Sequence, residues 1–232
     1  MRLPFLAVFC FLLLSMSSVG QVRFAVFAGP QRTSAHYTVT FEKIKQATCF
    51  KSGVMGGVGA KIEFDNQLYF FPSVYYSLKG YEVYLKTPAF PPTEFAKYNN
   101  TTVHTIEVSP LFHIDFNKKP SHLFVRFGPA VDVAFKGRER FDTVSSTSGE
   151  SARVDRSMVF SFGDYGRFSA QANLHFGYEA KNGFMIFAFY EDGFGSMNNA
   201  DRGPKIFHRI GGISFGWVFG KNPLVTDTSP IR

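Results

Sequence analysis

The segment 167-RFSAQANLHFGYE-179 carries the pattern that decides the fold of this chain. Apolar side chains occupy every second position from Phe168 to Tyr178, and polar or small side chains occupy the positions between them. A period of two is typical of a β-strand with one apolar face and one polar face. At 13 residues, the segment exceeds the usual strand of about five or six residues. It suits a tilted strand that crosses a bilayer, which needs about 9 to 11 residues.

The same alternation recurs along most of the chain. Residues 105–115 and 123–136 repeat it most clearly, with Ile106, Val108 and Phe112 on one face of the first of these segments. The sequence predicts eight such strands, at residues 22–29, 54–64, 67–79, 103–115, 121–136, 166–179, 184–191 and 206–219. An even number of strands is what an up-and-down barrel requires if both of its ends lie on one side.

The connections between these strands alternate in length. They are short at 65–66, 116–120 and 180–183, and long at 30–53, 80–102, 137–165 and 192–205. Outer-membrane barrels have short periplasmic turns and long outside loops. We therefore predict an all-β fold, an eight-stranded antiparallel up-and-down transmembrane β-barrel in the outer membrane, with both termini periplasmic.

A soluble lipid-binding barrel would show the same alternation with its apolar face turned inward. The composition favours the membrane barrel. The chain contains 29 Phe and 10 Tyr, yet its mean hydropathy is only -0.04, so apolar and polar residues are finely interleaved. The polar faces hold glycines such as Gly57 and Gly128 among isolated charges, as a narrow lumen requires, and aromatics such as Trp217 fall at strand ends, where membrane girdles lie.

The first 20 residues have the features of a secretory signal peptide: a basic start, an apolar run from 3 to 14, and small residues before Gln21. We expect a signal peptide at 1–20, the barrel at 21–220 and a periplasmic tail at 221–232. Cys10 would leave with the signal peptide, so that Cys49 would remain as a single thiol unable to form an internal disulfide.

The net charge of +7 arises from scattered residues rather than from a basic run. In the richest stretch, residues 136–140, Glu139 lies among the cations. We therefore expect no nucleic acid as a partner. Moderate basicity of this kind is consistent with solvated loops near an anionic surface, and outer-membrane lipid or lipopolysaccharide is the expected partner.

Four stretches resemble the PorT-like outer membrane β-barrel proteins of Bacteroidetes. They are the repeated glycines of 53–61, 71-FPSVYYSLKG-80, 106-IEVSPL-111 and 127-FGPA-130. The resemblance spans nearly all of the mature chain and implies the same barrel fold. It also implies an alternative function, an accessory role in a type IX secretion or gliding apparatus. The chain departs from the family pattern in continuing for residues 220–232 beyond Phe219.

Some barrels of this size are lipid hydrolases, and two sets of residues have suitable types for that chemistry: Ser109, His113 and Asp115, and Ser169, His175 and Glu179. Both sets lie on the predicted lumen face, whereas barrel hydrolases carry their catalytic groups on the lipid-facing side. We expect lumen histidines and no enzyme. The remaining histidines lack metal-ligand spacing, and no phosphate loop or dinucleotide motif is found, so no metal or other cofactor is expected.

The charged residues of the polar faces predict a filled lumen. If the register holds, eight side chains point inward: Lys61, Glu63, Glu107, Arg126, Asp132, Lys136, His175 and Glu179. An eight-stranded barrel is just wide enough for its own side chains to fill, and desolvated charges there must pair. We predict an ion-paired interior around Glu107 and Arg126, with no diffusive pore. The barrel would then act through its outside loops as a structural or interaction protein, with 137–165 as the leading candidate for contact with a protein partner.

Overall fold

A computed structural model describes residues 22–39, 43–87, 89–93, 95–144 and 150–220 of the chain. The predicted signal peptide and tail lie outside the described residues. The strands are β1 (Arg23–Val39), β2 (Ile44–Lys45), β3 (Ala47–Cys49), β4 (Lys51–Asp65), β5 (Leu68–Lys79), β6 (Glu82–Tyr84), β7 (Ala96–Asp115), β8 (His122–Val144), β9 (Ser151–Ser157), β10 (Phe168–Glu179), β11 (Phe184–Gly193) and β12 (Lys205–Phe219). In the part of the chain described, no helix is long and apolar enough to cross a membrane.

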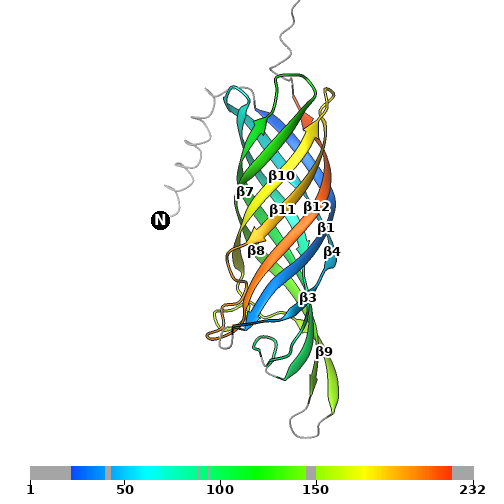
Figure 1. The fold of residues 1–232 in the computed structure, drawn as a ribbon, viewed down its shortest axis with the longest axis vertical. Coiled ribbons are helices and arrows are strands. Elements are labelled where there is room, and N and C mark those ends of the chain that lie inside the picture. Colours follow the sequence, from blue (N-terminus) through cyan, green and yellow to red (C-terminus); the bar gives the residue numbers. More distant parts are fainter. Residues whose placement is uncertain (1–21, 40–42, 88, 94, 145–149, 221–232) are drawn as a thin grey trace, which may run out of the picture.

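Eight of these strands close into a ring in the order β1-β4-β5-β7-β8-β10-β11-β12, and β12 returns to β1. Every pairing around the ring is antiparallel. Figure 1 shows the strands wound at a steep tilt around one long cylinder. The predicted eight-stranded antiparallel barrel is confirmed.

The two ends of the barrel differ. Short connections join β4 to β5, β7 to β8 and β10 to β11 at one end, which we call the turn end. The opposite end, the loop end, carries the longer connections and the additional strands β2, β3, β6 and β9. β1 begins and β12 ends at the turn end, where Phe24 lies opposite Phe219 across the closing seam.

The apolar faces of the strands point outward. Along β8, Leu123, Phe127 and Val131 are 43%, 42% and 48% exposed, whereas the intervening Arg126 and Asp132 are buried. The same arrangement holds along β7, β10 and β12, so that the outside of the barrel carries a continuous apolar band. A soluble lipid-binding barrel would show the reverse arrangement.

At the loop end, the strands continue beyond the ends predicted from the sequence. β1 runs on to Val39, β7 begins at Ala96 and β8 extends to Val144, so much of the predicted loops 30–53, 80–102 and 137–165 is paired strand. The outer face becomes polar there, and the apolar alternation stops although backbone pairing continues. A separate hydrophobic cluster, which includes Tyr81, Val103 and Ile206, fills the inside of this extension.

A β-bulge near Phe135 changes which side chains of β8 point inward. His104 pairs with Lys136, but the next residue, Thr105, pairs with Ala134, so that β8 carries one extra residue. Because side chains alternate with a period of two, one extra residue exchanges the two faces of the strand. Phe135 and Lys136 are both exposed as a result, and Glu139 points inward.

Candidate functional site: the filled interior of the barrel

A first ionic cluster, the turn-end cluster, lies inside the barrel near the turn end. Lys61 Nζ lies 2.7 Å from Asp115 Oδ2 and 3.1 Å from Glu179 Oε2, and Arg23 Nη2 lies 2.6 Å from Glu179 Oε1. His122 Nε2 lies 3.0 Å from Asp115 Oδ1. All five side chains are at most 5% exposed. Side chains from β1, β4 and β8 thus converge on two carboxylates, which come from β7 and β10.

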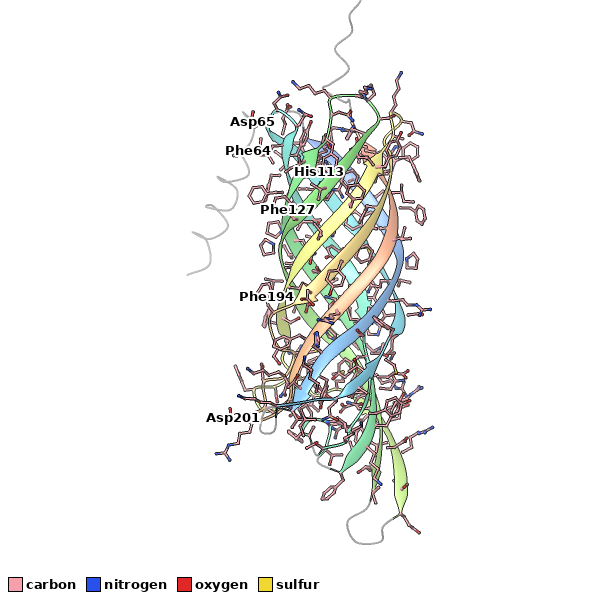
Figure 2. All side chains as sticks on the ribbon, in the orientation of Figure 1. Phe64, Asp65, His113, Phe127, Phe194 and Asp201 are labelled. Atoms are coloured by element: carbon pink, nitrogen blue, oxygen red, sulfur yellow. The ribbon has the colours of Figure 1, made fainter. Side chains whose placement is uncertain are left out.

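Arg126 borders this cluster without joining an ion pair in the part of the chain described. Its Nε donates a hydrogen bond of 2.7 Å to His113 Nδ1, and His113 Nε2 lies 2.6 Å from Asp115 Oδ1. Its guanidinium lies 3.7 Å from the centre of the Phe71 ring and 4.3 Å from that of Phe124. Figure 2 shows His113 in the half of the barrel nearer the turn end, on the side of Phe64 and Asp65.

A hydrophobic layer fills the middle of the lumen. Its larger buried members are Phe27, Met55, Phe71, Tyr75, Leu111, Phe124, Met185, Phe187, Phe189 and Ile210. His175 lies in this layer and stacks on Phe187, with ring centroids 5.1 Å apart. Aromatic rings therefore fill the middle of the lumen, which would contain water in an open pore.

A second ionic cluster, the Lys79 cluster, lies between this layer and the loop end. Lys79 Nζ lies 2.9 Å from Glu107 Oε2 and 2.8 Å from Asp132 Oδ2. The Tyr75 hydroxyl donates a hydrogen bond to Glu107, and its oxygen also lies 3.0 Å from Glu191 Oε1. Gln171 and Asn173 donate to Glu191 and Glu107 from the neighbouring wall. One buried ammonium thus holds carboxylates from two strands, with neutral donors completing their hydrogen bonds.

The structure places six of the eight predicted lumen residues in the interior: Lys61, Glu107, Arg126, Asp132, His175 and Glu179 are each at most 3% exposed. Lys136 is exposed because the bulge turns it outward, so its predicted position inside the lumen was wrong. Glu63 points inward but is half-buried at the turn-end rim, with no ion pair among the described residues.

Glu107 and Arg126, around which the ion-paired interior was predicted, do not lie at the same level of the lumen. Glu107 lies opposite Asp132, and Arg126 lies opposite His113. Arg126 and Asp132 are six residues apart on β8, which corresponds to about 20 Å along a strand. Glu107 and Arg126 therefore belong to different levels of the lumen, and the cation that pairs with Glu107 is Lys79.

The ionic network contains four charged residues that were not among the eight predicted from the sequence: Arg23, Lys79, Asp115 and Glu191. A signal was present for Lys79, because Tyr75, Ser77 and Lys79 alternate in phase on one face of the predicted strand. Asp115 also lies in phase with Glu107. The two-residue alternation therefore indicates that both residues point inward. It does not show which charges lie at the same height along the lumen.

The two residue sets considered for hydrolysis are not assembled as catalytic triads. Ser109 Oγ contacts Tyr75 and Glu107 rather than His113. Ser169 Oγ donates to Asp132, 2.9 Å away, and His175 stacks on Phe187. A serine nucleophile needs a base within about 3 Å. The described residues also contain no group of three or more His, Cys, Asp or Glu side chains able to hold a metal ion.

Beyond the apolar band, at the loop end, a third polar group surrounds Glu139. Tyr165 donates a hydrogen bond of 2.8 Å to Glu139 Oε2, and Arg156 Nε lies 2.7 Å from Glu139 Oε1. Burial raises the pKa of the Tyr165 phenol well above its ordinary value, and the nearby Tyr81 and Glu139 raise it further. Tyr165 therefore stays a neutral donor to the carboxylate.

Comparison with solved structures gives matches of low sequence identity, three of which follow. The attachment invasion locus protein Ail of Yersinia pestis, solved with the heparin analogue sucrose octasulfate, is 14% identical with a TM-score of 0.44, covering 86% of this chain and 100% of that chain. Neisserial surface protein A is 14% identical with a TM-score of 0.42, covering 84% and 97%. The N-terminal β-barrel domain of Pseudomonas aeruginosa OprF is 12% identical with a TM-score of 0.27, covering 84% and 96%. Comparison with curated proteins gives no match.

The family comparison is more informative. The profile of the outer membrane protein beta-barrel domain family matches residues 17–199, which include seven of the eight ring strands, and β12 follows the match and closes the ring. The chain therefore belongs to the outer membrane protein beta-barrel domain family and is an integral protein of the outer membrane.

Proposed function

We propose that this protein is a non-enzymatic outer-membrane barrel with a closed lumen, which acts through its loop end as a structural or interaction protein. The observation that carries the proposal is the filled interior. Two buried ionic clusters and a layer of rings occupy the cross-section, and the carboxylates of the clusters are bound by buried cations or by neutral donors. Groups that are paired in this way support the barrel and are not free to act on a substrate.

Conductance in planar bilayers tests the closed lumen. Purified protein should insert without producing stable open channels. A variant with the packed layer thinned, Phe187→Ala with Phe71→Ala, serves as the comparison because it removes two of the rings. Stable single-channel steps from the unaltered protein would contradict the proposal.

The proposed orientation places the loop end outside the cell and the turn end in the periplasm. Cys49 lies at the loop end and is exposed, so it provides a natural label. A membrane-impermeant maleimide should label Cys49 on intact cells. The control is Cys49→Ser combined with Asn66→Cys at the turn end, which should react only after the outer membrane is permeabilised. The opposite pattern would reverse the orientation.

The hairpin of β8 and β9 is the proposed contact surface for a protein partner. It projects past the rest of the barrel (Figure 1), within the region 137–165, and every residue of β9 except the half-buried Val154 is exposed. Removing residues 142–153 should leave the barrel folded but abolish co-purification of any partner from native membranes. Recovery of the same proteins with the shortened variant would place the contact elsewhere.

The resemblance to PorT-like proteins supports a second proposal, an accessory role in type IX secretion or gliding. The motif residue Lys79 has a structural role in this fold, since it is the cation of the Lys79 cluster. The motif therefore supports the barrel fold more strongly than the secretion role. Loss of cargo export in a strain lacking this chain, with rescue by the unaltered gene, would favour the accessory role, and normal export would exclude it.

A further inference from the structure

A cleft of about 330 Å³ opens on the outer wall of the barrel at the loop end, where β7 and β8 pass the start of β4. It is lined by Lys51, Asn100, Thr102, His104, Lys136, Gly137, Arg138 and Arg140. Four of these eight residues carry a cation and none carries a carboxylate. The filled lumen does not account for this cleft, because it lies on the opposite face of the same strands.

One cation of the cleft is held rigidly in place. Lys51 Nζ donates hydrogen bonds to Asn100 Oδ1, the Thr101 carbonyl and Thr102 Oγ1, at 2.6, 2.6 and 2.8 Å. Burial lowers the pKa of the Lys51 ammonium, although the nearby Glu82 raises it. An ammonium with its donors already occupied contributes a fixed positive field to the cleft.

Lys136 supplies a cation that remains available. The bulge at Phe135 turns this side chain outward, and the described residues give its ammonium no hydrogen bond or ion pair. Arg138 and Arg140 share one carboxylate, Asp155, at 2.5 and 2.7 Å. Arg138 uses two of its N–H donors on Asp155 and Arg140 uses one, so the cleft keeps an excess of positive charge and of free N–H groups.

The cleft lies at the edge of the apolar band. Directly beside it, the rings of Tyr76, His104 and Phe135 lie with centroids 6.0 to 6.4 Å apart. The next outward side chains along β7 toward the turn end are Ile106 and Val108, which are apolar and exposed. Aromatic girdles mark the level of the headgroups in outer-membrane barrels. The cleft thus begins where the apolar band ends, at the level expected for lipid headgroups.

A second cleft, of about 370 Å³, continues from the first toward the loop end and shares Asn100 and Arg140 with it. Its other lining residues are Tyr84, Tyr98, Asp142 and Arg153. The rings of Tyr84 and Tyr98 lie 5.1 Å apart, and Tyr84 is 51% exposed. An aromatic surface flanked by alternating charges offers apolar faces and hydrogen-bonding groups together, as a sugar ring requires.

We propose that the two clefts bind one phosphorylated glycolipid of the outer leaflet, with its phosphate among Lys136, Arg138 and Arg140 and its sugar against Tyr84 and Tyr98. A phospholipid headgroup would occupy the first cleft only. The proposal rests on the proposed orientation, since a loop end in the periplasm would face a different leaflet. It does not depend on any protein partner of the hairpin.

The test uses the purified full barrel in a zwitterionic detergent, and native mass spectrometry measures the lipid bound to each barrel. The probes are bisphosphorylated lipid A, its dephosphorylated form, phosphatidylglycerol and inorganic phosphate. We expect Lys136→Gln with Arg140→Gln to weaken lipid A binding at least about tenfold, since the variant removes two charge-assisted contacts with the phosphate. The control Arg202→Gln with Lys205→Gln removes the same charge near β12, on the other side of the ring, and should leave binding unchanged. Lys136→Arg should preserve it.

Four outcomes would overturn the proposal. These are unchanged binding in the Lys136 and Arg140 variant, an equal loss in the Arg202 and Lys205 control, equal affinity for phosphatidylglycerol, and equal affinity for inorganic phosphate. Unchanged binding in the variant, or an equal loss in the control, would show that lipid A does not bind at this site. Equal affinity for phosphatidylglycerol or inorganic phosphate would show that the site does not select a glycolipid. Because detergent-solubilised protein exposes both ends, failure here is distinct from failure of the Cys49 labelling, which tests orientation alone.

Discussion

At the scale of single residues, Lys79 is the side chain on which the interior most depends. It is the cation that bridges Glu107 and Asp132 inside a lumen with almost no solvent access. Lys79→Met keeps the apolar stem but leaves these carboxylates without their cation. Breaking a buried ion pair from one side costs about 3–5 kcal/mol. We expect a loss of that size in the free energy of unfolding, measured by urea titration of the refolded barrel with the gel-mobility shift as readout.

Lys136→Met provides the matched control for this prediction. The side chain lies on the neighbouring wall but is exposed, and exposed substitutions usually change stability by less than about 0.5 kcal/mol. If Lys136→Met were as damaging as Lys79→Met, the bulge would not turn Lys136 outward, and the proposed lipid site would lose its available cation.

Gly57 gives a second prediction at this scale. It faces the lumen from β4, and a methyl group built on it would overlap the Cβ of Tyr75 and the Val74 carbonyl. The space beside Gly57 is occupied by Tyr75 of β5, which hydrogen-bonds to both Glu107 and Glu191. Gly57→Ala should lower stability by about 1–3 kcal/mol, as overpacking does. Gly163→Ala, whose added methyl group would meet no atom within 4 Å, should leave the same urea midpoint unchanged.

At the scale of an element, the two faces of β8 respond to opposite environments. Val131 lies in the middle of the outer band and is 48% exposed. In lipid vesicles, Val131→Arg should cost about 2–4 kcal/mol, since arginine at the bilayer midplane is costly, while a position near the interface costs about 0–1 kcal/mol. Ala152→Arg on the exposed β9 serves as the comparison. Equal tolerance of the two substitutions would indicate that the band does not face lipid.

The β8–β9 hairpin is joined by surface ion pairs that depend on pH. The hydrogen bond from Arg138, supported by Arg140, lowers the pKa of Asp155 below its ordinary value of 3.8. Because the pKa of Asp155 is lowered, its ion pairs with Arg138 and Arg140 are fully formed at pH values above 3.8. They are lost as the pH falls through the lowered pKa. Carbon NMR titration of Asp155 should give a midpoint below 3.8, and Arg138→Gln should raise it. An unchanged midpoint in that variant would show that Arg138 is not the cause.

At the scale of the whole molecule, stability depends on closure of the ring. Residues 215–219 of β12 pair with residues 24–28 of β1 inside the apolar band. An open sheet edge in a bilayer leaves backbone groups unsatisfied at several kcal/mol each. A chain ending at Ile213 should therefore lose the faster migration of the unboiled folded barrel, and a chain ending at Gly220 should retain it. Retention in the shorter chain would mean that β12 is not needed for closure.

The strand pattern made most of the barrel predictable. Each predicted segment overlaps one ring strand, and the turn-end boundaries agree within about two residues, as Asp115 and Glu179 show. The loop-end boundaries were less accurate, because β1 and β7 continue as paired strands after the apolar period has ended. Where both faces of a strand carry polar and apolar residues, the alternation disappears, and the sequence no longer shows that the backbone is paired.

The sequence predicted that charged residues fill the interior, but it did not predict which of them pair. Alternation identified Lys61, Asp132 and Glu179 as inward residues, and the sequence by itself determined a β-barrel with charged groups inside and an apolar face outside. Only the tertiary structure decided which charges meet. Register and tilt set the level of each side chain along the lumen, and one extra residue at Phe135 turned Lys136 from the lumen to the outer wall. Pairing in a closed sheet depends on strands far apart in the chain, and periodicity within one strand carries no information about its neighbour.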